Sequence, residues 1–195
     1  MNIGVLLFHE VGELDVVGPY SVLSAARDLL EDDKAFDLFT VAKSRNSVQT
    51  AAAMTVTPTW AFASAPPVDV LIVPGGRGVE AGMKDRALTQ YLMMRRENLE
   101  LLASVSSGAL LLGELGYLKD KTVTTHPSLF ERIEDYEVRR VAQDRVVKDG
   151  DLWTSGGSTA GLDLGLELVR HFFSDDLARR VAKHLDITVS QPGLF

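Results

Sequence analysis

The chain has 195 residues, of which 46% are hydrophobic and 24% charged, and its formal net charge is −7. These values predict one soluble globular domain over residues 1–195, large enough for a three-layer core. The acidic balance argues against nucleic acid or an anionic membrane as the main partner. The chain lacks cysteine, which excludes disulfides, thiolate zinc sites and a cysteine nucleophile in the chain as written.

The beginning of the chain, MNIGVLLFHE, bears on the compartment. It has no positively charged segment, and its apolar run is too short for a signal peptide. No run elsewhere approaches the roughly 18 apolar residues of a membrane span. We therefore expect a cytoplasmic protein whose first apolar run is a strand.

The first hundred residues alternate apolar runs with helical patterns. Near-continuous apolar runs predict strands that are covered on both faces, at 2–8, 36–42 and 68–73. Pro19 suits the first turn of a helix that continues over 20–30. We expect an extended or hairpin segment over 47–57 and a helix from about 85 to 98.

The stretch 101–116, LLASVSSGALLLGELG, is the most informative part of the sequence. An apolar run reaches Val105, the chain turns at 106–108, and an Ala- and Leu-rich segment continues to a C-terminal Gly116. This pattern predicts a buried strand, a tight turn and a helix. Such a junction would place the side chain of Ser106 at the carboxyl edge of a sheet, over backbone N–H groups.

The remaining residues continue the alternation. A short strand at 122–125 would deliver His126, a short helix would cover 127–133, and the tail 186–195 is irregular. Small strands are predicted at 138–141, 145–148 and 152–155, and helices at 160–173 and 175–184. Strands that alternate with helices indicate an α/β fold, here a three-layer sandwich with a mostly parallel central sheet and helices on both faces, as in flavodoxin-like proteins.

Three loops rich in small residues follow predicted strands, at 74–78, 106–108 and 155–158. Ligands of open parallel sheets bind outside the carboxyl ends of the strands, so these loops are natural walls of a site. The backbone amides of Gly76 and Ser107 would converge there on an anionic oxygen. The alternative is that the loops are merely tight turns.

Five segments together resemble the ThiJ/PfpI superfamily, which is related to class I glutamine amidotransferases. The segments are LLFHEVGELDVVGPYSVL, DVLIVPGGRG, SVSSGALLLGELGYL, TVTTHPSL and WTSGGSTAGLDLGLELV, and they span nearly the whole chain. LDVVGP, TTH and SGGSTAGLDL are most similar to the isocyanide hydratase branch and to the amidase-like sensor domains of AraC-type regulators. The resemblance implies an α/β sandwich that forms a homodimer.

The resemblance also implies a set of site residues. The family's elbow holds a cysteine activated by a nearby carboxyl group, and these two positions fall on Ser106 and Asp15. The implied oxyanion and pocket residues are Gly75, Gly76, Ser107, His126, Thr154, Gly157 and Thr159. Without the resemblance, Asp15 just before a helix is more often an N-cap than a catalytic acid, and the resemblance makes the two readings about equal.

Serine at position 106 departs from the family pattern. A cysteine at a helix N-terminus can become a thiolate at neutral pH, whereas a serine hydroxyl needs a positioned general base. Three interpretations stay open: an engineered replacement of cysteine, a natural serine in a lineage with lost or changed chemistry, and a true serine nucleophile with His126 as its base.

The leading functional hypothesis is an isocyanide hydratase-like scaffold that is inactive or severely slowed by Ser106. The alternatives are a non-catalytic module that binds or senses a small molecule, and, more weakly, an amidase, another hydrolase or a glyoxalase-like enzyme. No two histidines have metal-ligand spacing, so we expect no metal and no cofactor. The expected partners are a small molecule and a second copy of the chain, with neither nucleic acid nor a membrane.

Overall fold

Seven strands form the central sheet, in the order β10-β11-β7-β6-β1-β2-β5. All neighbours are parallel except the hairpin pair β10–β11. The computed structural model describes residues 1–30, 32 and 34–188. The strands of the sheet are β1 (Asn2–Leu6), β2 (Asp37–Ala42), β5 (Trp60–Ala61), β6 (Val70–Val73), β7 (Leu101–Val105), β10 (Val146–Asp149) and β11 (Leu152–Ser155).

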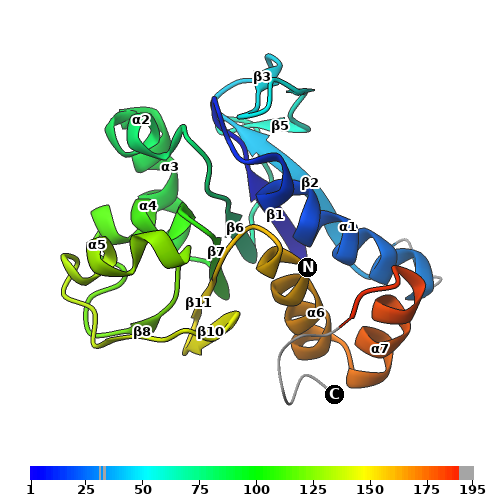
Figure 1. Cartoon of the computed structure of the whole chain (residues 1–195). Coiled ribbons are helices and arrows are strands. Elements are labelled where there is room, and N and C mark those ends of the chain that lie inside the picture. The colour runs from blue at the N-terminus through cyan, green and yellow to red at the C-terminus, as the bar shows by residue number, and fades with distance from the viewer. Residues whose placement is uncertain (31, 33, 189–195) are drawn as a thin grey trace.

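Helices cover both faces of this sheet, as Figure 1 shows. One group packs together on one side, namely α1 (Glu13–Leu30), α6 (Ala160–Phe172) and α7 (Asp175–His184). The other group comprises α2 (Val79–Lys84), α3 (Arg86–Arg96), α4 (Gly108–Glu114) and α5 (Phe130–Glu134). The predicted α/β class, with a mostly parallel sheet between helices, is confirmed.

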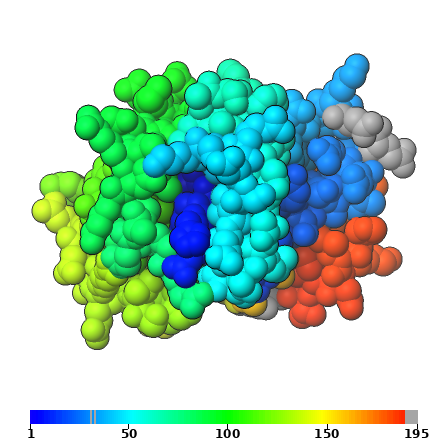
Figure 2. All heavy atoms as spheres, turned by 90° about the horizontal axis from the view of Figure 1, so that it is seen from above, coloured from blue at the N-terminus to red at the C-terminus, as the bar shows by residue number. Residues whose placement is uncertain are grey.

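Two small sheets and a 3-10 turn complete the described fold. They are β3 (Val48–Gln49) with β4 (Thr55–Val56), β8 (Thr122–Val123) with β9 (Arg140–Val141), and the 3-10 helix Pro127–Leu129. Figure 2 looks onto the carboxyl edge of the central sheet. There the blue N-terminal segment lies between the cyan segment of β3–β5 and the green segment of α2 and α3. Loops that are distant in sequence therefore meet at this edge.

Several predicted boundaries are wrong. Helix α1 begins at Glu13, so Pro19 lies inside it rather than in its first turn. The missing amide of Pro19 removes only one intrahelical hydrogen bond, and the buried face that α1 presents to α6 outweighs that loss. The sequence pattern also missed α2 and the two-residue strand β5. Of the tail 186–195, residues 189–195 lie outside the described residues.

Two buried carboxylates on α6 hold the edge of the sheet. Asp163 accepts hydrogen bonds from Arg145, at 2.6 Å from its Nη2, and Glu167 forms an ion pair with Lys148. Both carboxylates are almost fully buried, so their cationic partners compensate a large desolvation cost. The hairpin β10–β11 is thereby fixed to the helix that follows it.

Glycines allow α1 and α6 to approach closely, and they yield a test of this packing. A Cβ at Gly165 would lie 2.7 Å from the Cβ of Val22 and 3.3 Å from the Cα of Pro19, whereas a Cβ at Gly18 would meet nothing nearer than 3.7 Å. We expect Gly165→Ala to lower the free energy of unfolding by about 1–3 kcal/mol through overpacking.

Gly18→Ala is the matched control, on the facing helix. It should leave the stability unchanged or raise it by up to about 1 kcal/mol through its better helix propensity. Urea denaturation of both variants measures the difference. Equal effects of the two substitutions would contradict the described contact of α1 with α6.

Candidate active site

The turn between β7 and α4 holds Ser106 in a left-handed backbone conformation, with φ of 56°. A non-glycine residue rarely adopts this conformation, and it costs about 1 kcal/mol or more unless the surroundings impose it. Here the N–H of Ser106 donates to the carbonyl oxygen of Ser155 at 3.0 Å. Behind the turn, a Cβ at Gly108 would lie 2.2 Å from the carbonyl oxygen of Val73, so only glycine fits there. The strand, turn and helix predicted over 101–116 form an elbow that presents Ser106.

Asp15 lies in the first turn of α1 and its side chain is 2% exposed. Its Oδ2 accepts the N–H of Gly75 at 3.0 Å, and among the described residues no donor meets hydrogen-bond geometry at Oδ1. Burial raises the pKa of Asp15 above its ordinary value, although the Ser158 hydroxyl, the Gly75 amide and His126 each act in the opposite direction. Burial therefore shifts this carboxyl toward its protonated form. It does not cap the helix.

Gly75 brings the carboxyl and the elbow together. A Cβ at this position would lie 2.4 Å from Ser107 Oγ and 2.7 Å from Asp15 Oδ2. The absence of a side chain thus allows α1, the loop after β6 and the elbow to meet at one point. Gly75 itself supports the site from behind.

The two amides expected to bind an anionic oxygen are not equivalent. The N–H of Gly76 donates to Ser107 Oγ at 3.0 Å, so it is already used within the protein. The N–H of Ser107 donates to no acceptor among the described residues. Of the two, the Ser107 amide is therefore the open donor.

His126 and the elbow line one hollow, which is described below. The hydrogen bonds of His126 nevertheless oppose a role as a base. Its Nδ1 lies 2.8 Å from Ser128 Oγ and accepts the backbone N–H of Ser128 at 3.3 Å, which caps the 3-10 turn. A nitrogen that accepts a backbone amide carries no proton, so the neutral ring holds its proton on Nε2. In this arrangement His126 offers a donor rather than a base for Ser106.

A hollow of about 300 Å³ joins these groups at the carboxyl edge of the sheet. Of the predicted site residues, five line it: Asp15, Gly76, Ser106, Ser107 and His126. Sequence reasoning missed Gly12, Ala51, Ser128, Leu129 and Ser158. For Arg77 it favoured a solvated loop residue over a ligand of an anionic substrate, and the structure places Arg77 in the lining of the hollow. Loop 155–158 was recognised as a wall of the site, but nothing in the pattern distinguished Ser158 from its neighbours.

Two predicted pocket residues lie elsewhere. Thr154 is buried in β11, where its Oγ1 accepts the N–H of Thr124 at 2.8 Å. Thr159 is exposed, and its Oγ1 accepts a hydrogen bond from Arg145 at 3.3 Å. Gly157 is half-buried beside the ring of His126. These residues support the loops around the hollow rather than lining it.

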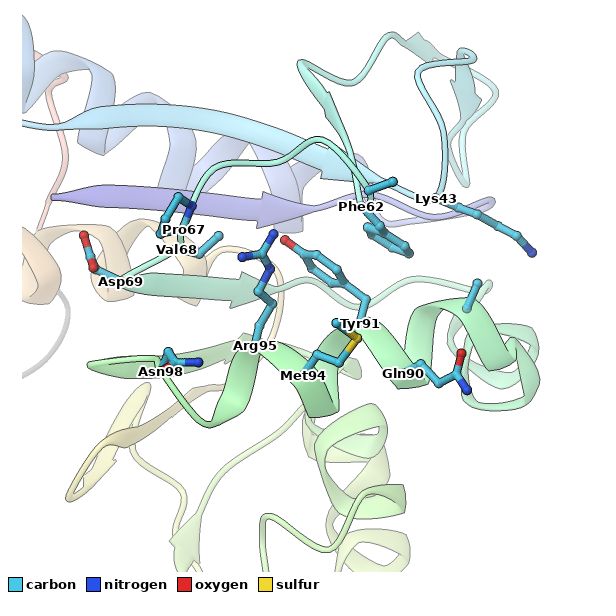
Figure 3. Close-up of a pocket in the computed structure, with 12 residues that line it drawn as sticks. Lys43, Phe62, Pro67, Val68, Asp69, Gln90, Tyr91, Met94, Arg95 and Asn98 are labelled. Atoms are coloured by element: carbon cyan, nitrogen blue, oxygen red, sulfur yellow. The ribbon is translucent and has the colours of Figure 1, made fainter.

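A larger hollow, of about 940 Å³, lies away from the elbow between α3 and the segment that leads into β6 (Figure 3). Its rings of Phe62 and Tyr91 stack at 4.1 Å, and the guanidinium of Arg95 lies over Tyr91 and donates to the carbonyl of Ala65. It contains none of the predicted site residues. These side chains satisfy one another, so size alone does not make this hollow the functional site.

Neither a metal-binding cluster nor a membrane-spanning helix is present among the described residues. Within residues 1–30, 32 and 34–188, no three His, Asp or Glu side chains gather where they would hold a metal ion. No helix described there combines the length and apolar character needed to cross a bilayer.

Fold and site together define an α/β protein with a strand–turn–helix elbow beside a buried carboxyl group. Residues 1–171 match the model of the DJ-1/PfpI family, and the chain belongs to this family. The isonitrile hydratase of Pseudomonas putida is 34% identical over 192 residues, which are 98% of this chain and 81% of that protein. The predicted resemblance to the ThiJ/PfpI superfamily is thereby confirmed.

Solved structures agree with this assignment. A ThiJ/PfpI family protein from Pseudomonas syringae has a TM-score of 0.88 at 28% identity, covering 98% of this chain and 76% of that one. Drosophila melanogaster DJ-1beta has a TM-score of 0.84 at 21% identity, covering 96% and 98%. The second likeness concerns the fold alone.

The raised pKa of Asp15 makes a prediction about stability and pH. The unfolded carboxyl ionises near pH 3.9, whereas the folded one keeps its proton to higher pH, so folding loses stability as the pH rises above about 4. The Asp15→Asn variant lacks this titration and so removes the loss. Its side-chain oxygen can still accept a hydrogen bond from the Gly75 N–H. We expect the variant to gain stability relative to the parent between pH 4 and pH 7, measured by urea denaturation.

Asp149→Asn is a control for which the opposite pH dependence of stability is expected. The Thr122 amide and Lys121 hold the pKa of Asp149 below its ordinary value, so its charge stabilises the fold above the unfolded pKa. The free energy of unfolding of the parent should increase relative to that of this variant as the pH rises from about 3 to 5. If Asp15→Asn followed the same trend as Asp149→Asn, the raised pKa of Asp15 would be disproved.

Proposed function

We propose that this chain is an isocyanide hydratase-like protein whose nucleophile position carries serine. The observation that carries the proposal is the elbow itself, where Ser106 is held beside the buried, protonation-prone carboxyl of Asp15 and the open amide of Ser107. The likeness to the Pseudomonas putida isonitrile hydratase over nearly the whole chain supports the choice of reaction.

The chemistry is derived for a thiol at position 106. The sulfur bonds to the terminal carbon of R–N≡C while a proton, supplied through Asp15, goes to the same carbon, which gives a thioimidate. Water then adds to that carbon, and the C–S bond breaks with return of the proton to sulfur. The product is the formamide R–NH–CHO, so one isocyanide and one water are consumed in each turn. The Ser107 amide would stabilise the oxygen that develops charge during water addition.

A serine at this position stops the first step. The influences that ionise a thiol near neutral pH leave an alcohol protonated, so Ser106 needs a general base. His126 Nδ1 accepts the Ser128 amide, and burial disfavours the carboxylate form of Asp15 that a base requires. The parent protein should therefore be inactive or severely slowed.

Turnover of an aryl or alkyl isocyanide, followed as formamide production, tests this proposal. Ser106→Cys is expected to produce formamide at least about a hundredfold faster than the parent, because only the thiol is activated without a base. The parent and Ser106→Ala are expected to be indistinguishable.

Two outcomes would reject parts of the proposal. If Ser106→Cys folds but turns over no isocyanide, the hydratase assignment is wrong. If the parent produces formamide faster than Ser106→Ala, Ser106 is itself a nucleophile. That result would favour the amidase, hydrolase and glyoxalase-like alternatives.

A second candidate function is binding of a small molecule without turnover. The specific observation in its favour is that the hollow keeps its carboxyl and its open amide while the nucleophile position lacks a base. Thermal-shift screening of small amides, amino acids and isocyanides against the parent tests it. A ligand that raises the melting temperature and is recovered unchanged supports a sensor.

We further propose that the protein forms a homodimer through an apolar patch beside the site. Leu14 and Val17 on α1 and Met54 in the β3–β4 turn are 40–55% exposed, and Val17 and Met54 line a shared hollow of about 290 Å³. Exposed apolar side chains gathered around a hollow are typical of an interface.

Sedimentation velocity tests this interface. Val17→Arg is expected to convert the dimer to monomer, because a charge would be buried at the interface. Met94→Arg, on α3, is the control, since Met94 is 72% exposed and lies outside the patch. A monomeric parent at micromolar concentration, or dissociation by Met94→Arg alone, would contradict the proposal.

A further inference from the structure

Thr125 is completely buried, yet it is not part of the hollow that forms the candidate site. Its Oγ1 donates a hydrogen bond of 2.8 Å to the carbonyl oxygen of Ser106. The only other described donor to this oxygen is the amide of Ala109, at a long 3.5 Å. The orientation of this carbonyl therefore depends mainly on the Thr125 hydroxyl.

That carbonyl belongs to the same peptide group as the open amide of the site. The Ser106–Ser107 peptide is trans and planar, so its C=O and its N–H point in opposite directions. A hydroxyl that fixes the carbonyl of Ser106 on one side fixes the N–H of Ser107 on the other. This matters because the N–H of Ser107 donates to no acceptor among the described residues, whereas that of Gly76 is already bonded to Ser107 Oγ.

Thr125 is itself held in place from the central sheet. The N–H of the preceding residue, Thr124, donates to Thr154 Oγ1 at 2.8 Å, and the following residue, His126, caps the 3-10 turn. Both Thr124 and Thr154 are buried. The segment therefore presents the Thr125 hydroxyl to the elbow from a fixed backbone.

We propose that Thr125 is a positioning residue, which orients the Ser107 amide toward the reacting atoms by holding the carbonyl of Ser106. This proposal rests on the proposed function, because the oriented amide stabilises the charge that develops during turnover. It touches no substrate and acts only through the peptide of the elbow. The hydrogen bond also accounts for the role of a buried hydroxyl that the candidate site does not otherwise use.

The test uses Ser106→Cys as the background, because the chain has no other cysteine and the single thiol reports on the elbow. Thr125→Val removes the hydroxyl and keeps the shape. We expect kcat for isocyanide hydration to fall at least about tenfold, with KM changed less than about twofold, because a misplaced oxyanion donor is felt in the transition state. Thr125→Ser, which keeps the hydroxyl, should restore kcat.

Titration of the single thiol, followed by thiolate absorbance, gives a readout independent of turnover. A thiolate at position 106 is stabilised by the oriented amides around it, so its pKa should rise in Thr125→Val and return in Thr125→Ser. If no variant turned over isocyanide, the proposed function would fail, and the titration would still decide the role of Thr125.

Thr124→Val is the matched control, since it is an adjacent buried threonine whose bond to the sheet is made by its backbone. It should leave both kcat and the thiol pKa as in the background protein. If Thr125→Val unfolds, the pair Thr125→Ser and Thr125→Ala replaces it, with the alanine variant lacking the hydroxyl. Equal kcat and equal thiol pKa in variants with and without the hydroxyl at position 125 would overturn the proposal.

Discussion

The left-handed backbone at Ser106 is the constraint on which the rest of the site depends. A side chain at φ of 56° projects from the sheet edge only because the flanking groups leave no alternative. The carbonyl of Ser155 holds the amide of Ser106, and Gly108 lets the elbow press against the loop after β6. The local strain is thus balanced by the packing of β6, β7 and β11 around it, which links the core of the sheet directly to the chemistry at its edge.

The same packing determines the electrostatics. Gly75 has no side chain, so the carboxyl of Asp15 can reach the elbow while remaining buried. Burial raises the pKa of this carboxyl and so favours its protonated form over the carboxylate. On the proposed function, such a site would activate a thiol and leave a hydroxyl unreactive. The conflict between a family-like elbow and its serine therefore has a physical basis, namely the missing base.

Much of the fold could be predicted from the sequence, because long periodic segments dominate it. The helix predicted at 175–184 begins and ends as the structure has it, and the elbow at 101–116 has the expected order of strand, turn and helix. Strand β5 was missed because two residues are too few to show a hydrophobic periodicity, and because its pairing depends on β2. The site was predicted in part: nothing local shows that Ala51, from a distant hairpin, closes the hollow, or that Thr154 faces the backbone of Thr124.

The proposed function requires that the elbow is competent and that only the serine prevents covalent chemistry. Intact-mass spectrometry after brief exposure to excess isocyanide tests it most directly, because Ser106→Cys contains a single thiol. We expect Ser106→Cys to carry one adduct of the isocyanide's mass per chain or to release formamide during the exposure, and the parent to do neither. An adduct on the parent that disappears in Ser106→Ala, or a folded Ser106→Cys protein that yields neither adduct nor formamide, would contradict the proposal.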